Sequence, residues 1–270
     1  MPESPEVQAL AEYLDRHLVA QRIVGADLEE FRALKTRARP LDELIGATVS
    51  GVHRFGKHVE IATDAAGLLI SFGRAGWALL DEQTDAPVLA RLEFDGGASL
   101  TVTDAGSFLS LGLSVVDDAR DVASIAKLGP DPLDPTYSRA QLDSALGSRR
   151  KQIRALLQEQ ESIAGIGGAY SDEILHVAKL SPVVHAVDLS DDDRDRLFAA
   201  VVEVLREAVA ARRGILPSGQ KAAKVDAMRV HGRTGEPCPV CAGTVQDVPG
   251  SKGAAQYCPT CQTGGVPLPG

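Results

Sequence analysis

The chain has 270 residues, 44% of them hydrophobic, and a formal net charge of −9. This length allows two compact domains, and no stretch approaches the ~20 consecutive apolar residues that span a membrane. Residues 1–136 carry 12 Lys and Arg against 22 Asp and Glu, whereas residues 137–235 carry 15 against 13. The overall charge argues against a polyanionic partner, but its distribution leaves the second half able to bind one.

The first predicted element is a helix that begins almost at the N-terminus. Ser4 is a suitable N-cap and Pro5 a suitable first helical residue, and such a start fixes Pro2 and Glu3 in space. The opening residues are acidic and no apolar run follows them, so we expect no signal peptide and a cytoplasmic protein. The apolar face of the helix contains Val7, Leu10, Ala11, Leu14 and Leu18.

An antiparallel β domain is predicted to follow. From Val49 to Val116 the sequence consists of short β-type runs separated by turn residues such as those at 95–97. Two prolines and a glycine at 128–132 cannot continue a helix or a strand, so this segment is predicted to link two domains. After it the chain reads as helical at 141–146, 149–158, 169–179 and 190–213, followed by a loop at 214–230.

Two features of this helical half could bind phosphate. A glycine cluster at 165–168 lies between two predicted helices, where backbone N–H groups and a helix N-terminus would suit an anion. A basic run, Arg149-Arg150-Lys151 followed by Arg154, opens one of the helices. Taken alone, the glycines are more typical of a tight turn without a ligand, and the basic run is more typical of a solvated helix face.

Four cysteines near the C-terminus form two Cys-x-x-Cys pairs that are sixteen residues apart. This spacing lets one tetrahedral Zn²⁺ close a short hairpin, and four protein ligands make such a zinc structural. Two disulfides or unpaired core cysteines are the alternatives, but an intracellular chain should keep its thiols reduced. The predicted ligands are Cys238, Cys241, Cys258 and Cys261.

The second residue allows a specific chemistry. Removal of Met1 would leave Pro2 with a secondary α-amine, and such amines titrate near pH ~8, so part of the population is neutral and nucleophilic at neutral pH. Attack on a sugar C1′ would give an iminium, and the adjacent Glu3 could move the protons. The alternative is an ordinary initiator methionine followed by a proline.

The order of the motifs resembles the formamidopyrimidine-DNA glycosylase / endonuclease VIII family along nearly the whole chain, as a divergent bacterial member. The matching motifs are Met-Pro-Glu-x-Pro-Glu-Val at 1–7, Phe-Gly-Lys at 55–57, the run 164–173, the run 230–238, and Tyr-Cys-Pro-x-Cys-Gln at 257–262.

The resemblance implies an α+β fold in three parts. Residues 1–128 would form an N-terminal antiparallel β-sandwich with flanking helices, and residues 129–232 a helix-two-turn-helix DNA-binding domain. Residues 233–265 would form the zinc hairpin, with DNA in the cleft between the domains.

It also implies base excision followed by strand cleavage by β,δ-elimination at the abasic site. Pro2 would be the nucleophile and Glu3 the acid/base. Lys57 would contact a DNA phosphate, and Glu173 corresponds to a glutamate near the catalytic proline. The candidate DNA-binding residues are Arg74, Phe108, Arg154, Gly165, Gly167, Gly168, Tyr170 and Lys252.

Several family residues that read the lesion are changed. The family methionine that fills the space of the flipped base is Arg74 here. The loop at 104–109 keeps a wedge in Phe108, but Gly106 takes the place of the arginine that bonds the orphaned base. The phosphate-binding asparagine is Gly168, and the hairpin arginine is Gly253, with only Lys252 beside it.

We therefore expect a DNA glycosylase with apurinic/apyrimidinic lyase activity, acting as a monomer on oxidised bases and abasic sites in double- or single-stranded DNA of the bacterial nucleoid. The expected cofactor is one structural zinc ion. The alternatives are a non-catalytic protein that binds abasic or distorted DNA and, more remotely, an RNA-binding zinc-hairpin protein. The Pro2-Glu3 pair favours the enzyme, because a protein that only binds DNA needs no free N-terminal proline.

Overall fold

The computed structural model describes residues 1–269 and divides into two compact units. The first unit contains residues 1–127 and 212–221, and the second contains residues 128–211 and those from 222 onward. No helix within the described residues is both long and apolar enough to cross a membrane.

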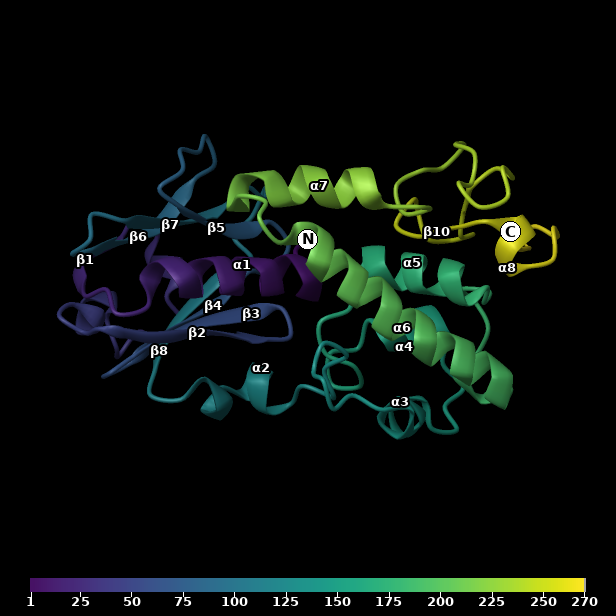
Figure 1. The fold of residues 1–270 in the computed structure, drawn as a ribbon, viewed down its shortest axis with the longest axis horizontal. Helices are drawn as coiled ribbons and strands as arrows, with labels where there is room; N and C mark the ends of the chain where they lie inside the picture. The colour runs from purple at the N-terminus through teal and green to yellow at the C-terminus, as the bar shows by residue number, and fades with distance from the viewer. Residues whose placement is uncertain (270) are drawn as a thin grey trace. The chain divides into compact units, whose positions relative to one another are not determined.

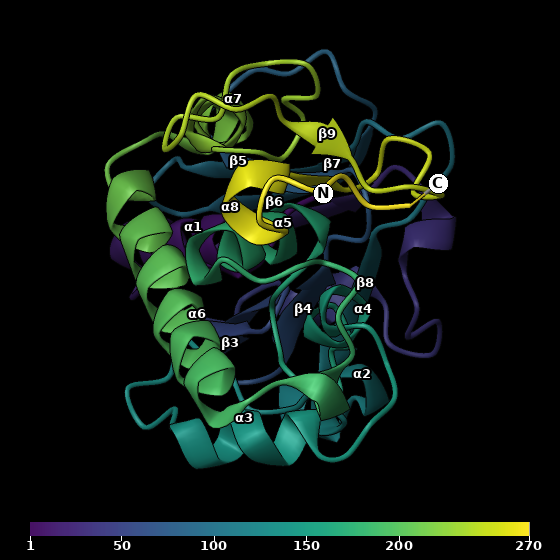
Figure 2. The ribbon, with the colours of Figure 1, turned by 90° about the vertical axis from the view of Figure 1, so that its right-hand side faces the viewer.

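The first unit is a sandwich of two four-stranded antiparallel sheets, which confirms the predicted α+β class. One sheet has the order β1-β6-β7-β5 and the other β2-β3-β4-β8. Figures 1 and 2 show the two sheets on opposite sides of α1. The strands are β1 (Ile23–Leu28), β2 (Val49–Phe55), β3 (His58–Thr63), β4 (Gly67–Ser71), β5 (Gly76–Leu80), β6 (Val88–Phe94), β7 (Ser99–Asp104) and β8 (Gly112–Val116).

Helix α1 (Ser4–Leu18) starts one residue earlier than its sequence predicts. Ser4 is the first helical residue and Glu3 is the N-cap, so the prediction of a Ser4 cap was wrong. The cause is a capping box, in which the Glu6 carboxylate accepts a hydrogen bond from the backbone N–H of Glu3 at 3.2 Å. With Ser4 as the N-cap, the third helical residue would be Val7. Valine has no side-chain acceptor, so the reciprocal hydrogen bond of a capping box could not form.

The apolar face of α1 packs into the core of the sandwich as its spacing predicts. Val7, Leu10, Leu14 and Leu18 are at most 1% exposed and share one cluster with apolar side chains of both sheets. Burying each such side chain contributes roughly 1.5–3 kcal/mol, so this face holds the N-terminal residues firmly on the sandwich. Short helical turns complete the unit at Phe31–Ala33, Leu41–Leu44, Ala119–Asp121 and α2 (Ala123–Ala126).

Residues 212–221 follow the long helix α6 and belong to the first unit. The indole N–H of Trp77 on β5 donates to the carbonyl oxygen of Pro217 at 2.8 Å. Arg213 forms two hydrogen bonds to the carboxylate of Glu12 on α1, at 2.7 and 2.8 Å. The chain therefore returns to the sandwich before it enters the C-terminal segment.

The second unit is helical up to its C-terminal hairpin. The helix predicted at 149–158 is half as long in the structure, because only α4 (Ile153–Leu157) forms and residues 149–152 are irregular. The other long helices lie within one or two residues of the predicted ranges. They are α3 (Arg139–Leu146), α5 (Gly168–Ala178) and α6 (Asp191–Arg212).

The loop predicted at 214–230 is also wrong, because it contains α7 (Gln220–Ala227) and a short turn at Pro217–Gly219. The segment Gln-Lys-Ala-Ala-Lys-Val-Asp-Ala has high helix propensity but no apolar repeat, so periodicity alone misses it. The chain ends in a hairpin of β9 (Gln246–Asp247) and β10 (Gln256–Tyr257), followed by α8 (Pro259–Gln262). Helix α5 packs against β10 and α8, as Figure 2 shows for α8.

Candidate functional site

The N-terminal dipeptide is anchored at the start of α1. Glu3 is only 2% exposed and its backbone N–H is bonded to Glu6, whereas Pro2 is half-buried. The partial positive charge at a helix N-terminus stabilises a carboxylate and disfavours a protonated amine nearby. The helix start therefore holds the backbone of Glu3, and with it the neighbouring Pro2, in a defined position.

A buried arginine from residues 212–221 of the first unit lies beside this end of α1. Nε of Arg212 lies 3.6 Å from the carboxylate of Glu6, and the two side chains are 3% and 4% exposed. The backbone carbonyl of Arg212 in turn accepts a hydrogen bond from the side chain of Gln220. Sequence reasoning missed this pair because the two partners are about two hundred residues apart in the chain.

Lys57 lies in the turn between β2 and β3, where Phe55 pairs with His58 and Gly56 has a φ of +55°. Nδ1 of His58 lies 2.7 Å from Oγ of Ser71 at the end of β4. Burial, with a contribution from the charge of Lys57, lowers the pKa of His58 to about 4. His58 is therefore neutral at pH 7, and its contact with Ser71 joins the turn that carries Lys57 to the end of β4, three residues before Arg74.

The loop after β7 is organised by one buried carboxylate. Asp104 is 4% exposed and accepts hydrogen bonds from the N–H groups of Gly106, Ser110 and Leu111 at 2.7–3.0 Å. Burial opposes ionisation, but these donors hold the pKa of Asp104 below its ordinary value. The loop is thus pre-formed around a charge that the family resemblance did not single out.

Arg74 and Phe108, which stand at the predicted lesion-reading positions, contact each other beside this loop. The backbone N–H of Arg74 donates to Oγ of Ser110 at 2.9 Å. The guanidinium carbon of Arg74 lies 5.6 Å from the ring centroid of Phe108, which is 61% exposed. A guanidinium over an exposed aromatic ring forms a flat platform on which a base can stack.

The glycine turn at 165–168 is held by a side chain from within the same unit. Gly165 has a φ of +87°, and its N–H donates to Oε1 of Gln160 at 2.9 Å, while Nε2 of Gln160 donates to the carbonyl of Ile166. Gly167 is the N-cap of α5 and Gly168 is its first residue. The N–H of Gly165 is therefore used by the turn itself.

Tyr170, also predicted to contact DNA, is 1% exposed and belongs to the apolar core of the second unit. Its ring lies 4.8 Å from Nζ of Lys224 on α7, which is a cation–π contact. Tyr170 therefore fixes α5 and α7 relative to each other inside this unit, and its ring is not part of the surface.

Part of the basic run is neutralised within the protein. Arg149 bonds the carboxylate of Glu159 at 2.6 Å, and Lys151 forms a very short contact with the same carboxylate. These partners, Lys151 first, lower the pKa of Glu159 to about 2. Arg154 instead donates through Nε to Asp172 at 2.6 Å and through Nη2 to the carbonyl of Ala254 at 2.7 Å.

Glu173 lies beside Asp172 on α5 and is 3% exposed. Its carboxylate accepts three backbone hydrogen bonds, from Arg229 at 2.8 Å, Val230 at 2.9 Å and His231 at 3.0 Å. Burial raises the pKa of Glu173, and these donors oppose the shift. The contacts assign Glu173 to holding the segment that leads into the cysteine hairpin.

The four cysteines form one cluster in which all the Sγ atoms lie within 4.8 Å of one another. Cys241 and Cys258 are 3.4 Å apart and Cys238 and Cys261 are 3.9 Å apart at Sγ, so none of them is disulfide-bonded. A tetrahedral zinc with Zn–S bonds of ~2.3 Å separates its sulfurs by about 3.8 Å. The donor set therefore fits one metal ion, and the disulfide alternative is excluded for this conformation.

The protein groups alone do not favour thiolates at all four cysteines. Burial raises the pKa of Cys258 and Cys261, whereas the backbone N–H of Gly243 lowers the pKa of Cys241 to about 7. Four thiolates this close repel one another unless a cation lies between them. Lys252, in the hairpin, is exposed and has a positive φ of 53°.

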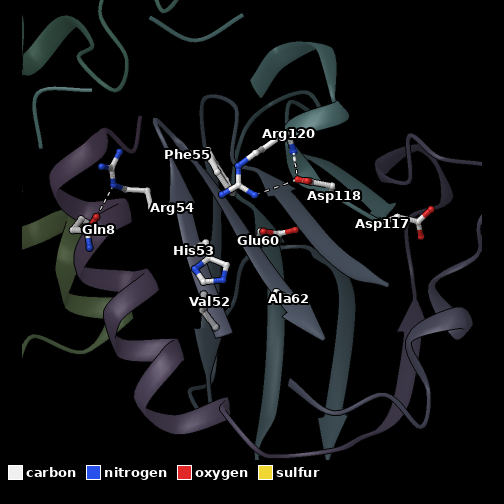
Figure 3. A pocket seen from close by; sticks show the side chains of 10 residues that line it. All are labelled: Gln8, Val52, His53, Arg54, Phe55, Glu60, Ala62, Asp117, Asp118 and Arg120. Atoms are coloured by element: carbon white, nitrogen blue, oxygen red, sulfur yellow. Dashed lines mark hydrogen bonds and ion pairs between the residues drawn. The ribbon is translucent and has the colours of Figure 1, made fainter. Parts of the chain in front are cut away.

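A separate polar hollow lies over β2 and β3 (Figure 3). Its arginines are already engaged, since Arg54 donates to Gln8 at 2.7 Å and Arg120 pairs with Asp118 at 3.5 Å. Glu60, also in the hollow, accepts from the N–H of Ala119. The predicted site residues lie outside this lining, so the candidate site is not this hollow.

Comparisons with known proteins agree with this arrangement. Residues 1–111 match the formamidopyrimidine-DNA glycosylase N-terminal domain, and residues 128–218 match the formamidopyrimidine-DNA glycosylase H2TH domain. A formamidopyrimidine-DNA glycosylase of Rhizorhabdus wittichii is 33% identical over 97% of this chain and 100% of that protein.

Two further proteins resemble the chain. A formamidopyrimidine-DNA glycosylase-like protein of Mycobacterium tuberculosis is 47% identical over 52% of this chain and 88% of that protein. The crystal structure of Lactococcus lactis FPG (MutM), in complex with a FAPY-dG-containing DNA, has a TM-score of 0.84 at 25% identity. It covers 96% of this chain and 99% of that one.

Proposed function

Because the chain belongs to the formamidopyrimidine-DNA glycosylase family, we propose that it excises damaged bases from DNA through the amine of Pro2 and then cleaves the strand as a lyase. The family places the chain in base-excision repair as a DNA glycosylase. The observation that carries the proposed mechanism is the Pro2-Glu3 pair at the capped start of α1.

The chemistry begins when Met1 has been removed. The nitrogen of Pro2 attacks C1′ of the flipped nucleotide, the bond from C1′ to the base breaks, and the base leaves with a proton. The nitrogen loses its own proton, the C1′–O4′ bond of the sugar ring breaks as O4′ takes up a proton, and an iminium remains at C1′. Glu3 moves these protons, because it is the carboxylate next to the nucleophile in the chain.

Strand cleavage follows from the same intermediate. The iminium acidifies the C2′ proton, so a base can remove it and the 3′ phosphate leaves by β-elimination. A second elimination releases the 5′ phosphate, and water then hydrolyses the imine and regenerates Pro2. Two phosphate termini are the expected products.

Several of the other predicted residues bind the DNA. Lys57 contacts a phosphate beside the lesion from the β2–β3 turn, and the turn at 165–168 contacts a second phosphate. The Arg74–Phe108 platform stacks on the bases exposed when the damaged nucleotide flips out. Glu173 acts through the segment 229–231 that it holds.

The metal we propose is Zn²⁺, held by Cys238, Cys241, Cys258 and Cys261. Bound there, zinc closes the hairpin and supplies no catalytic step, because all four positions are protein ligands. The hairpin then presents Lys252 to the DNA. The protein is proposed to act as a monomer on duplex DNA and, because the platform needs no opposite strand, on single strands.

Borohydride trapping tests the mechanism. An oligonucleotide with one abasic site, mixed with the protein and sodium borohydride, should give a covalent adduct of one chain and one strand. A version that retains Met1 should bind the oligonucleotide but form no adduct through Pro2, since the retained residue turns the amine of Pro2 into an amide.

The outcomes separate the two functions. An adduct that persists when Met1 is retained would show that another amine, with Lys57 the first to examine, is the nucleophile. Tight binding to abasic DNA without any adduct from the processed protein would identify it as a non-catalytic DNA-binding protein.

A further inference from the structure

Arg154 occupies a built position between α5 and the cysteine hairpin. Nε donates to Oδ1 of Asp172, and Nη2 donates to the carbonyl oxygen of Ala254. The side chain of Asp172 is 0% exposed, and its Oδ2 lies 2.7 Å from Nδ1 of His231 and accepts from the N–H of Gln256 at 3.1 Å. The guanidinium is therefore held in one orientation by two groups of the second unit, Asp172 on α5 and the carbonyl of Ala254 in the hairpin.

The same guanidinium lies beside the first residue of α5. A Cβ at Gly168 would be 3.6 Å from Nη2 of Arg154 and 3.9 Å from Oε1 of Gln158, which is ordinary van der Waals contact. Gly168 has no side chain of its own, and Gly253, just before Ala254, has none either. Arg154 therefore lies in contact distance of the Gly168 position and bonds the residue that follows Gly253.

Part of this guanidinium remains available. Among residues 1–269, Nη1 of Arg154 makes no hydrogen bond, and 18% of the side chain is exposed. Arg149 and Lys151 differ, because both are paired with Glu159. An oriented arginine with one unused edge suits a phosphate, which accepts hydrogen bonds from guanidinium groups strongly.

We propose that Arg154 is the phosphate anchor of this turn, and that it supplies from α4 the contact that neither Gly168 nor Gly253 can make. The ligand is a backbone phosphodiester of DNA, so the inference rests on the proposed function. Asp172 orients Nε, Ala254 orients Nη2, and Nη1 donates to the phosphate. A Cβ at Gly168 would fit beside the guanidinium, whereas a longer side chain would compete with it for space.

The test is the salt dependence of binding to a duplex that contains a tetrahydrofuran abasic analogue, which the lyase cannot cleave. One lost phosphate contact lowers the slope of log K against log salt by about 1. Arg154→Ala should show this loss and bind roughly tenfold or more weakly near 0.1 M salt. Arg206→Ala, which removes an exposed charge from α6 of the same unit, is the matched control and should change neither quantity.

A second substitution tests whether a side chain at position 168 can take the place of the Arg154 guanidinium. Gly168→Asn places an amide where the guanidinium lies, and its Cβ fits. In the Arg154→Ala background it should recover much of the affinity without recovering the slope, since an amide is uncharged. Arg154→Lys should keep the slope and lose part of the affinity, because an ammonium cannot bond Asp172, Ala254 and a phosphate in the same fork.

A purely structural role for Arg154 gives a different pattern. Affinity would then fall together with the melting temperature and zinc content, at an unchanged slope, and Gly168→Asn would not help. That pattern overturns the inference. So does an Arg154→Ala variant whose affinity and salt slope equal those of the wild type. If Arg154→Ala does not fold, Arg154→Gln removes the charge and retains a donor to Ala254. The assay needs no catalysis, so a failed borohydride trap would leave it unaffected.

Discussion

Nε2 of His176 lies 3.3 Å from Sγ of Cys238. His176 is on α5, both residues are at most 3% exposed, and burial lowers the pKa of His176. In the tautomer with its proton on Nε2, the ring donates to Sγ of Cys238 and orients this predicted ligand, as outer-shell partners of metal ligands do. The helix that begins at the glycine turn therefore also supports the predicted zinc centre.

His176→Leu should weaken zinc retention, because it removes this donor while filling a similar volume. Loss of an outer-shell partner costs about 10- to 100-fold in metal affinity. We expect one zinc per chain in the wild type by elemental analysis, and faster release to a chromogenic chelator from the variant.

His185→Leu, which removes an exposed histidine from the same unit, is the control and should release zinc at the wild-type rate. Equal release from the His176 and His185 variants would contradict the role of His176. Absence of zinc from the freshly purified wild type would contradict the metal site itself.

Glu3→Gln should affect the two chemical steps unequally. Proton transfer by a positioned carboxylate contributes about 10²- to 10⁴-fold, and it assists departure of the base. At an abasic site the base has already left, so strand cleavage there should fall less than base removal. Rates on a damaged-base duplex and on an abasic duplex measure the difference. Equal losses on both duplexes would indicate that Glu3 serves mainly to cap α1.

Discrimination among opposite bases should be weak. Gly106 has no side chain to bond the orphaned base, and the Arg74–Phe108 platform stacks on any base. One bidentate base contact is worth roughly 1–3 kcal/mol, so its loss removes about ten- to a hundredfold of preference. We expect poor activity on 8-oxoguanine opposite cytosine. Cleavage of abasic sites and oxidised pyrimidines should vary little with the partner base and persist on single strands.

Rates with all four opposite bases test this directly. A preference for cytosine above roughly a hundredfold exceeds what one such contact supplies and would show that another residue reads that base. Phe108→Ala and Arg74→Ala should each weaken binding to all four duplexes alike.

His58 should make the first unit less stable in acid. Its pKa is about 4 in the fold, against 6.5 for the ordinary side chain. Between pH 6.5 and 4 the histidine is protonated in the unfolded chain but not in the folded chain. The free energy of unfolding therefore falls as the pH drops from 6.5 towards 4. The cost between pH 7 and 4.5 is roughly 2 kcal/mol.

His58→Gln should lose this part of the pH dependence, while keeping a polar partner for Ser71. Trp77 is the only tryptophan and lies in the same unit, so its fluorescence follows the relevant unfolding transition. A pH dependence unchanged in the variant would assign the acid sensitivity to other groups.

Local sequence determined the chemistry of individual positions. The Cys-x-x-Cys spacing specified a single cluster, since one metal can join only ligands that a short hairpin brings together. The spacing of apolar residues determined α1, because its inward face follows the 3.6-residue period. Pro2 and Glu3 are adjacent in the chain, so no folding was needed to predict that they lie together.

Tertiary structure decided which charges are available. The sequence shows a run of cations from Arg149 to Arg154, but Glu159 neutralises two of them and Arg154 is oriented by Asp172. These partners are 8 to 18 residues away. Pairing at such separations depends on how helices and turns pack, which no local pattern encodes.

The same holds for long-range contacts between motifs. Arg74 meets Phe108, His176 meets Cys238, and Glu6 meets Arg212 only because separate elements fold against one another. Residue type and spacing determined which groups the protein carries, because those are properties of the chain. Packing determined which of them face solvent and which are satisfied inside, because burial and hydrogen bonding are properties of the folded state alone.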